Sequence, residues 1–256
     1  MDATATNRIR FNPLLPYWAV LQTDLRQTLR SWVYRLWVLM SVLGAAGFLL
    51  YKVGLHREAG VVQTASVQTE NLLRGLMVGG LGLIALIAVS SISSERASVA
   101  DAVLSRGISR HQYFLAKWHA RLVVVVSTFA GLAAVILTAH HFLFEADLTT
   151  AGGAVAVAHV ALVLTVVVSW GVTIGALTSG TVTGITLFWF LLYGGIVVLS
   201  LLPEPYPTPD RMLGKLHFIL RGEYDPAVLV QVAGVTLTLS VVAAAVGLLG
   251  FSRKDV

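Results

Sequence analysis

The sequence predicts an all-α membrane protein with six transmembrane helices, an amphipathic interfacial helix before the first of them, and a cytoplasmic helical insert between the second and third. The 256 residues are 56% hydrophobic and only 12% charged, and their mean hydropathy is +0.79. A soluble domain carries about 25% charged residues. The few charges are also clustered, since residues 148–203 form a run of 56 residues without Asp, Glu, Lys or Arg.

The apolar segments define the predicted spans, because about 20 apolar residues cross a bilayer as a helix. The six spans cover residues 33–54, 72–94, 119–143, 153–177, 183–202 and 227–251. The first has the shortest uncharged stretch, between Arg35 and Lys52. The long side chains of these two residues can reach the membrane interface.

The positive charges predict the orientation. Six spans place both termini on one side, and twelve of the 18 Lys and Arg residues fall on that side. Cytoplasmic segments carry the excess of Lys and Arg. We therefore expect both termini and the loop at 95–118 in the cytoplasm, with the protein in a prokaryotic plasma membrane. This topology accounts for most of the net charge of +5 and speaks against nucleic-acid binding.

Residues 13–31 predict an amphipathic helix that lies in the membrane interface. Asn12 can cap this helix, and Pro13 suits its first position. Apolar residues recur at steps of three and four, with Trp18 and Trp32 suited to headgroup depth. The polar residues Asp24, Arg26, Gln27 and Arg30 lie largely off that stripe. A longer, tilted first span is the alternative interpretation.

The loop at 95–118 concentrates charge in a chain that has little. We expect the second span to continue as a helix through 95–106 and to end at Gly107, a natural C′ residue. Ser109 and Gln112 then form a capping box at the start of the next helix. These signals favour a rigid helix–turn–helix over a merely solvated loop.

The loop at 203–226 lies on the outer side. It begins with alternate prolines, which exclude a helix there. Apolar residues between Met212 and Leu220 then predict a short interfacial or partly re-entrant helix, with an ordinary ordered loop as the alternative.

Elsewhere, two glycine pairs at four-residue spacing indicate close helix packing, inside the bundle or at a dimer seam. They are Gly75 with Gly79 and Gly171 with Gly175.

Few residues offer catalytic chemistry. The chain has no cysteine, no G-x-x-x-x-G-K-[ST] phosphate loop and no paired carboxylates in its spans, so we expect it to be no enzyme and to hold no metal. His140 and His141 are expected at the membrane interface. His159 lies inside the fourth span, where a buried histidine is usually hydrogen-bonded but can also contact substrate. The predicted substrate path comprises Thr186, Trp189, Tyr193 and His159, with lipid-facing aromatic residues as the alternative.

The stretch from Ile92 to Lys117 resembles the ABC-2 type transporter permeases. Members of that family typically follow their second span with an acidic–basic cluster, a short amphipathic segment, an S-R-P-I-S-R-like turn and a G-K element. The matching positions here are Glu95, Arg96, Asp101, residues 105–110, Ala116 and Lys117. Residues 251–256 are also similar to the family's F-x-R-R-D ending. Gly107 replaces the usual Pro, Ser98 and Val99 replace a Gly-Thr pair, and Ala116 replaces Gly.

The resemblance implies that residues 1–256 form one transmembrane domain, the non-catalytic half of an ATP-driven transporter. A second permease chain, identical or paralogous, pairs with it. A soluble ABC ATPase, which binds ATP and Mg²⁺, docks on a coupling helix within 95–118, so this chain itself needs no cofactor. The implied contacts are Glu95, Arg96, Asp101, Arg106, Gly107, Ser109 and Arg110, with Arg26 and Arg30 as a second contact.

Two functions follow from the sequence and the resemblance. The first is the permease subunit of an exporter of a lipid, hydrophobic drug or peptide, because sparse charge inside the membrane argues against a strongly charged small solute. The second is a membrane subunit that transmits ATP-driven motion to an extracytoplasmic partner, through the loop at 203–226, without moving a solute itself.

Overall fold

The computed structural model describes residues 14–59, 64–94, 108–144, 147–201, 208, 211 and 213–253. These residues are predominantly helical and include no β-strand. The helices are α1 (Leu15–Arg30), α2 (Trp32–Ala59), α3 (Ala65–Ser93), α5 (Arg110–Leu143), α6 (Thr150–Leu177), α7 (Thr181–Ser200), α9 (Leu216–Arg221) and α10 (Pro226–Ser252). Six of them, all except α1 and α9, are long and apolar enough to cross a membrane.

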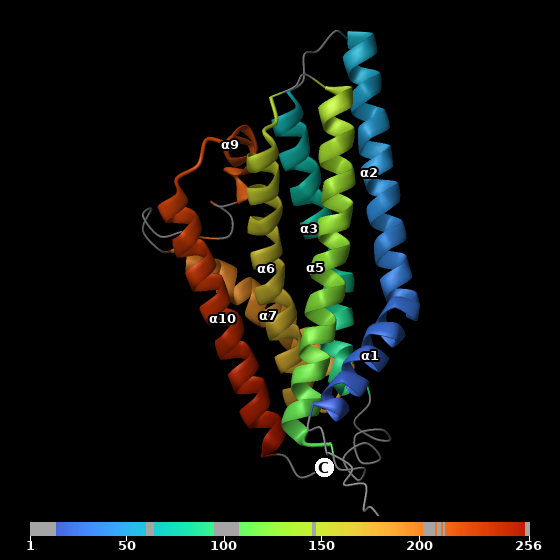
Figure 1. The fold of residues 1–256 in the computed structure, drawn as a ribbon, viewed down its shortest axis with the longest axis vertical. Helices are drawn as coiled ribbons and strands as arrows, with labels where there is room; N and C mark the ends of the chain where they lie inside the picture. The colour runs from blue at the N-terminus through green and yellow to red at the C-terminus, as the bar shows by residue number, and fades with distance from the viewer. Residues whose placement is uncertain are drawn as a thin grey trace, which may run out of the picture.

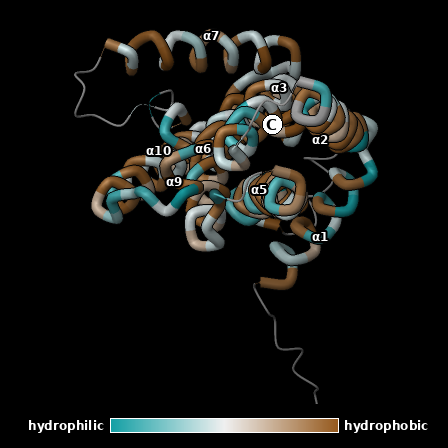
Figure 2. The backbone as a smooth tube through the Cα atoms, turned by 90° about the horizontal axis from the view of Figure 1, so that it is seen from above, coloured by the Kyte–Doolittle hydropathy of each residue, from teal (hydrophilic) through white to brown (hydrophobic). Residues whose placement is uncertain are grey.

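The long helices other than α7 run alongside one another, with α1 crossing one end of the bundle and α9 at the opposite end (Figure 1). We call these the α1 end and the α9 end. The central helix is α6, which packs against α3, α5, α7, α9 and α10. Seen from above, α7 runs along one edge of the bundle (Figure 2), where it touches α3 and α6 and buries only Gly184 and Phe188.

One of the two glycine pairs makes a close helix contact. A Cβ built on Gly171 would lie 2.6 Å from the Cβ of Ala88, and a Cβ on Gly175 would clash with the carbonyl oxygen of Val89. The prediction of packing inside the bundle is therefore right for this pair, which brings α6 against α3. The other pair, Gly75 and Gly79, is exposed, with no atom within 4 Å of a built Cβ.

The helices α1 and α2 are separate, and the alternative of one long tilted span is wrong. Ser31 has an extended backbone between them, with φ −65° and ψ 145°. Its hydroxyl donates to the Thr28 carbonyl at 2.8 Å and accepts from the Tyr34 amide at 3.2 Å. This arrangement lets the chain change direction at Ser31, while the interfacial location of α1 stays a prediction.

Helix α3 begins well before the predicted span, at Ala65 rather than at residue 72. Helix α5 begins at Arg110, directly after the predicted Ser109–Gln112 capping box, so the predicted helix into the third span is confirmed there. The extra turns of α3 are polar. They are helical because their side chains find partners on neighbouring segments, a long-range effect that apolar run length cannot reveal.

A candidate docking end at α1 and α5

The predicted apolar stripe of α1 is partly buried and partly exposed. Two of its members lie on α5: Leu21 packs with Ala116 and Ala120, beside the partly buried Tyr17 and Leu25. Other members of the stripe face outward, namely Leu14, Trp18, Leu29 and Trp32. An outward apolar stripe on a helix at the end of a membrane bundle is typical of contact with the lipid interface.

A buried charge cluster fixes α1 to α5. Asp24 lies off the apolar stripe, as predicted, yet it is only 1% exposed. Its Oδ1 accepts from Lys117 Nζ at 2.9 Å and from Arg121 Nη2 at 3.1 Å. Arg121 Nη1 also donates to the hydroxyl of Thr28, one turn further along α1, and that hydroxyl donates to the Asp24 carbonyl at 2.7 Å. Two cations of α5 thus surround one carboxylate of α1.

A second polar contact ties the start of α1 to the same helix. The Tyr17 hydroxyl lies 3.1 Å from Nδ1 of His119, a nitrogen that also lies 2.8 Å from the Leu115 carbonyl. Partial burial raises the pKa of the Tyr17 phenol above its usual value of 10.0. The phenol is therefore neutral at physiological pH.

The first turn of α5 has the predicted capping box. The Ser109 hydroxyl accepts from the Gln112 amide at 3.2 Å, and the Gln112 side chain accepts from the Ser109 amide at 3.2 Å. The next residue, Arg110, donates from Nη1 to the carbonyl of Ser252 at the end of α10, at 3.2 Å. The first turn of α5 is thus held both by its own cap and by α10.

The predicted contacts for a soluble partner lie partly in this region. Arg26 and Arg30 are exposed on α1, while Ser109 and Arg110 begin α5. The remaining predicted contacts, Glu95, Arg96, Asp101, Arg106 and Gly107, lie outside the described residues. So does most of the predicted coupling helix, which therefore stays a prediction.

The predicted substrate path is only partly brought together. Trp189 and Tyr193 stack on α7 with their ring centroids 5.5 Å apart, and Trp189 lies beside Gly82 of α3. Thr186 is exposed on α7. His159 is buried inside α6, and its Nε2 has no hydrogen-bond partner among the described residues. The structure gives no contact between His159 and the α7 residues, so a common path stays a prediction.

Sequence reasoning missed a polar cluster at the α9 end. Asp147 Oδ1 accepts from the Ser66 amide at 2.8 Å, and Oδ2 accepts from the Ser66 hydroxyl at 2.5 Å and from Arg221 Nε at 3.0 Å. Partial burial alone would raise the pKa of Asp147, but the bonds from Ser66 and the charge of Arg221 hold it below its usual value. The only feature of the sequence that pointed to this cluster is the presence of polar residues next to the predicted spans.

The same cluster seats α9 on the bundle. Glu70 of α3 accepts from the amide of His217 at 3.2 Å, and the two side chains pair at 2.5 Å. Leu216, Ile219 and Leu220 are buried against α3 and α6. A short helix was one of the two structures expected here, with an ordered loop as the alternative, and a short helix is present. His140 lies in the last turn of α5 and is buried, with Nδ1 2.6 Å from the Thr69 hydroxyl, and its location at the membrane interface stays a prediction.

Comparison with known proteins assigns the chain to no family: no protein-family model matches the sequence, and no curated protein is significantly similar to it.

Proposed function

We propose that this chain is the membrane-spanning permease subunit of an ATP-driven transporter of the ABC-2 type, and that a separate soluble ATPase docks at the α1 end. The observation that carries the proposal is the attachment of α1 to α5 through Asp24, Lys117 and Arg121. A helix with exposed arginines is thereby held rigidly to a membrane span. A push on α1 from a soluble partner would pass directly to α5.

The exposed cations make the proposed docking end positively charged. Guanidinium groups pair well with carboxylates at protein interfaces, so Arg26 and Arg30 favour an acidic surface on the ATPase. ATP and Mg²⁺ would be bound by that partner. A second copy of the chain, or a paralogue, would complete the membrane part. The apolar spans favour export of a lipid, a hydrophobic drug or a peptide.

The second candidate function, motion transmitted to an extracytoplasmic partner, has less support. It requires an accessible surface in the loop at 203–226. The apolar side chains of α9 are already packed against α3 and α6, which leaves Phe218 as its one exposed large apolar residue. Most of residues 202–212 lie outside the described part of the chain, so this candidate depends on residues that the structure does not place.

The proposal is tested by reversing the two exposed charges of α1 together, Arg26→Glu with Arg30→Glu. The chain is co-expressed with ABC ATPases of the same genome, purified through a tag, and assayed for ATPase activity in lipid nanodiscs. We expect the wild type to retain an ATPase and the double variant to lose about ten-fold or more of it, since close interfacial charges contribute strongly to affinity.

The matched control reverses two cations at the opposite end, Lys52→Glu with Lys215→Glu, and is expected to retain the ATPase at the wild-type level. A wild-type chain that purifies with no ATPase would contradict the proposed function. Equal retention by both double variants would contradict the docking role of α1.

A further inference from the structure

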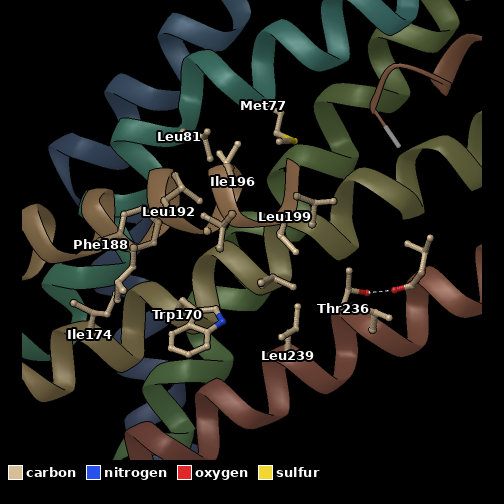
Figure 3. Close-up of a pocket in the computed structure, with 17 residues that line it drawn as sticks. Met77, Leu81, Trp170, Ile174, Phe188, Leu192, Ile196, Leu199, Thr236 and Leu239 are labelled. Atoms are coloured by element: carbon tan, nitrogen blue, oxygen red, sulfur yellow. Dashed lines mark hydrogen bonds between the residues drawn. The ribbon is translucent and has the colours of Figure 1, made fainter. Parts of the chain in front are cut away.

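An apolar groove runs between α7 and α10, with α6 and α3 as its floor (Figure 3). Its volume is about 440 Å³, within the range of roughly 300–1,000 Å³ of small-ligand sites. On α7 its lining extends from Phe188 to Leu199, a length of about 16 Å at 1.5 Å per residue. The groove is therefore long, and it lies within the span region.

The mouth of the groove opens on the outside of the bundle. Leu191 and Ile196 of α7, and Val235 and Leu239 of α10, line the groove and are each 40–46% exposed. Helix α7 lies along the edge of the bundle (Figure 2). Since both helices are long and apolar enough to span a membrane, the hydrocarbon of the bilayer lies at this mouth.

Two polar side chains interrupt the apolar lining. The indole of Trp170 lies on the α6 wall of the groove (Figure 3), and its N–H makes no hydrogen bond within the described part of the chain. The Thr236 hydroxyl donates to the Val232 carbonyl at 2.8 Å, which leaves its lone pairs as acceptors. A tryptophan N–H away from water usually has a partner. The groove thus fits an apolar ligand that supplies one acceptor to Trp170.

The depth of Trp170 indicates what that acceptor is. Helix α6 has 28 residues, about 42 Å at 1.5 Å per residue, so each end reaches about 6 Å beyond a hydrocarbon core of about 30 Å. Trp170 lies seven residues from the end of α6 at Leu177, about 10 Å along the axis. It is therefore only about 4–5 Å inside the hydrocarbon on the α1 side. A lipid ester carbonyl lies near that boundary.

We propose that the groove binds one acyl chain of a membrane lipid from the leaflet at the α1 end. The ester carbonyl accepts a hydrogen bond from Trp170, and the chain follows the groove between α7 and α10 toward the middle of the bilayer. This site depends only on the placement of the six apolar helices in a membrane. It does not depend on ATP-driven transport.

A helix of a second copy fits the groove less well. The backbone carbonyls of a transmembrane helix already accept a bond within the helix, so one of them would have to accept a second donor to serve Trp170, whereas a lipid ester carbonyl is free to accept. An extended hydrocarbon chain with one ester carbonyl supplies that free acceptor.

Adjacent glycines of α7 provide an occlusion variant and its control. Gly195 lines the groove and Gly194 does not, and neither has an atom within 4 Å of a built Cβ. Gly195→Phe therefore fills the groove without a clash at Cβ, and Gly194→Phe adds the same side chain outside it. The full chain is placed in nanodiscs of phosphatidylcholine with a photoreactive diazirine in one acyl chain. After irradiation, labelled peptides are identified by mass spectrometry.

We expect the wild type and Gly194→Phe to be labelled on the groove residues, and labelling there to fall at least about five-fold in Gly195→Phe. A second arm compares ester-linked with ether-linked lipid. The wild type should retain the ester lipid about three- to ten-fold better, the range of one hydrogen bond, and Trp170→Phe should lose that preference. Equal groove labelling in both glycine variants, no groove labelling in the wild type, or cross-links between two copies through α7 and α10 would overturn the proposal.

Discussion

Asp24 is the residue on which the position of α1 depends, because its carboxylate joins side chains of two helices. Local periodicity places it off the apolar stripe of α1 but does not reveal its burial, since Lys117 and Arg121 are 93 and 97 positions away in the chain. Removing one partner of a buried ion pair leaves an uncompensated charge, which costs roughly 3–5 kcal/mol. Asp24 is therefore a sensitive position for the attachment of α1.

We predict that Asp24→Ala detaches α1 while the six spans stay folded. Two buried cations would lose their carboxylate, so the opening of α1 should become more than about 100-fold easier, the equivalent of about 3 kcal/mol. Hydrogen exchange of residues 15–30 in nanodiscs measures this opening. Arg26→Ala is the control, because Arg26 is exposed on the same helix and should change stability by less than about 0.5 kcal/mol. Unchanged exchange in Asp24→Ala would contradict the role of the charge cluster.

Asp147 predicts a pH dependence at the opposite end. Its pKa is lower in the folded protein than its usual 3.8, so it stabilises the fold at pH values above the unfolded pKa. That contribution is lost as the pH falls below about 4 toward the folded pKa. Thermal unfolding in detergent should therefore show a loss of stability in this range for the wild type. The loss should be smaller in Asp147→Asn, and an equal loss in both proteins would count against the cluster.

At the scale of helices, apolar run length and capping residues predict which elements exist. The six spans, the separate helix before them and the Ser109–Gln112 capping box follow from local patterns. The polar first turns of α3 do not. Ser66 and Glu70 are helical because Asp147, Arg221 and His217 meet them in space, which no local pattern records. The candidate docking site shows the same division. Local periodicity predicts that Arg26 and Arg30 are exposed on α1, but it does not predict the ion pairs of Asp24 with Lys117 and Arg121 that hold α1 in place.

The glycine pairs also show that a local motif does not determine packing, because the same four-residue spacing is packed between helices in one pair and exposed in the other. We predict that Gly175→Ala destabilises the bundle by about 1–3 kcal/mol, the usual cost of overpacking, since its Cβ meets the backbone of Val89. Gly79→Ala has open space around its Cβ and should be neutral or stabilising by up to about 1 kcal/mol, because alanine favours a helix. Denaturant unfolding in micelles compares the two variants. Equal destabilisation would contradict the described contact of α3 with α6.

Across the whole molecule, the two ends of the bundle are held by different charge clusters. The α1 end is joined through Asp24, and the α9 end through Asp147 and Glu70. Helices α3 and α6 also meet closely toward the α1 end, at Gly171 and Gly175. These contacts make α1, α5 and the central helices one connected body, and α7 packs on α3 and α6 at its edge.

The most direct test of the central claim is site-specific cross-linking from α1 to the proposed ATPase. The chain contains no cysteine, so Arg30→Cys provides a single attachment point for a thiol-linked photocross-linker, and Lys215→Cys provides the matched point at the α9 end. In membranes that contain the co-expressed ATPase, we predict a cross-link to that subunit from position 30 and none from position 215. A cross-link from position 215, or none from position 30 in the presence of bound ATPase, would contradict docking at the α1 end.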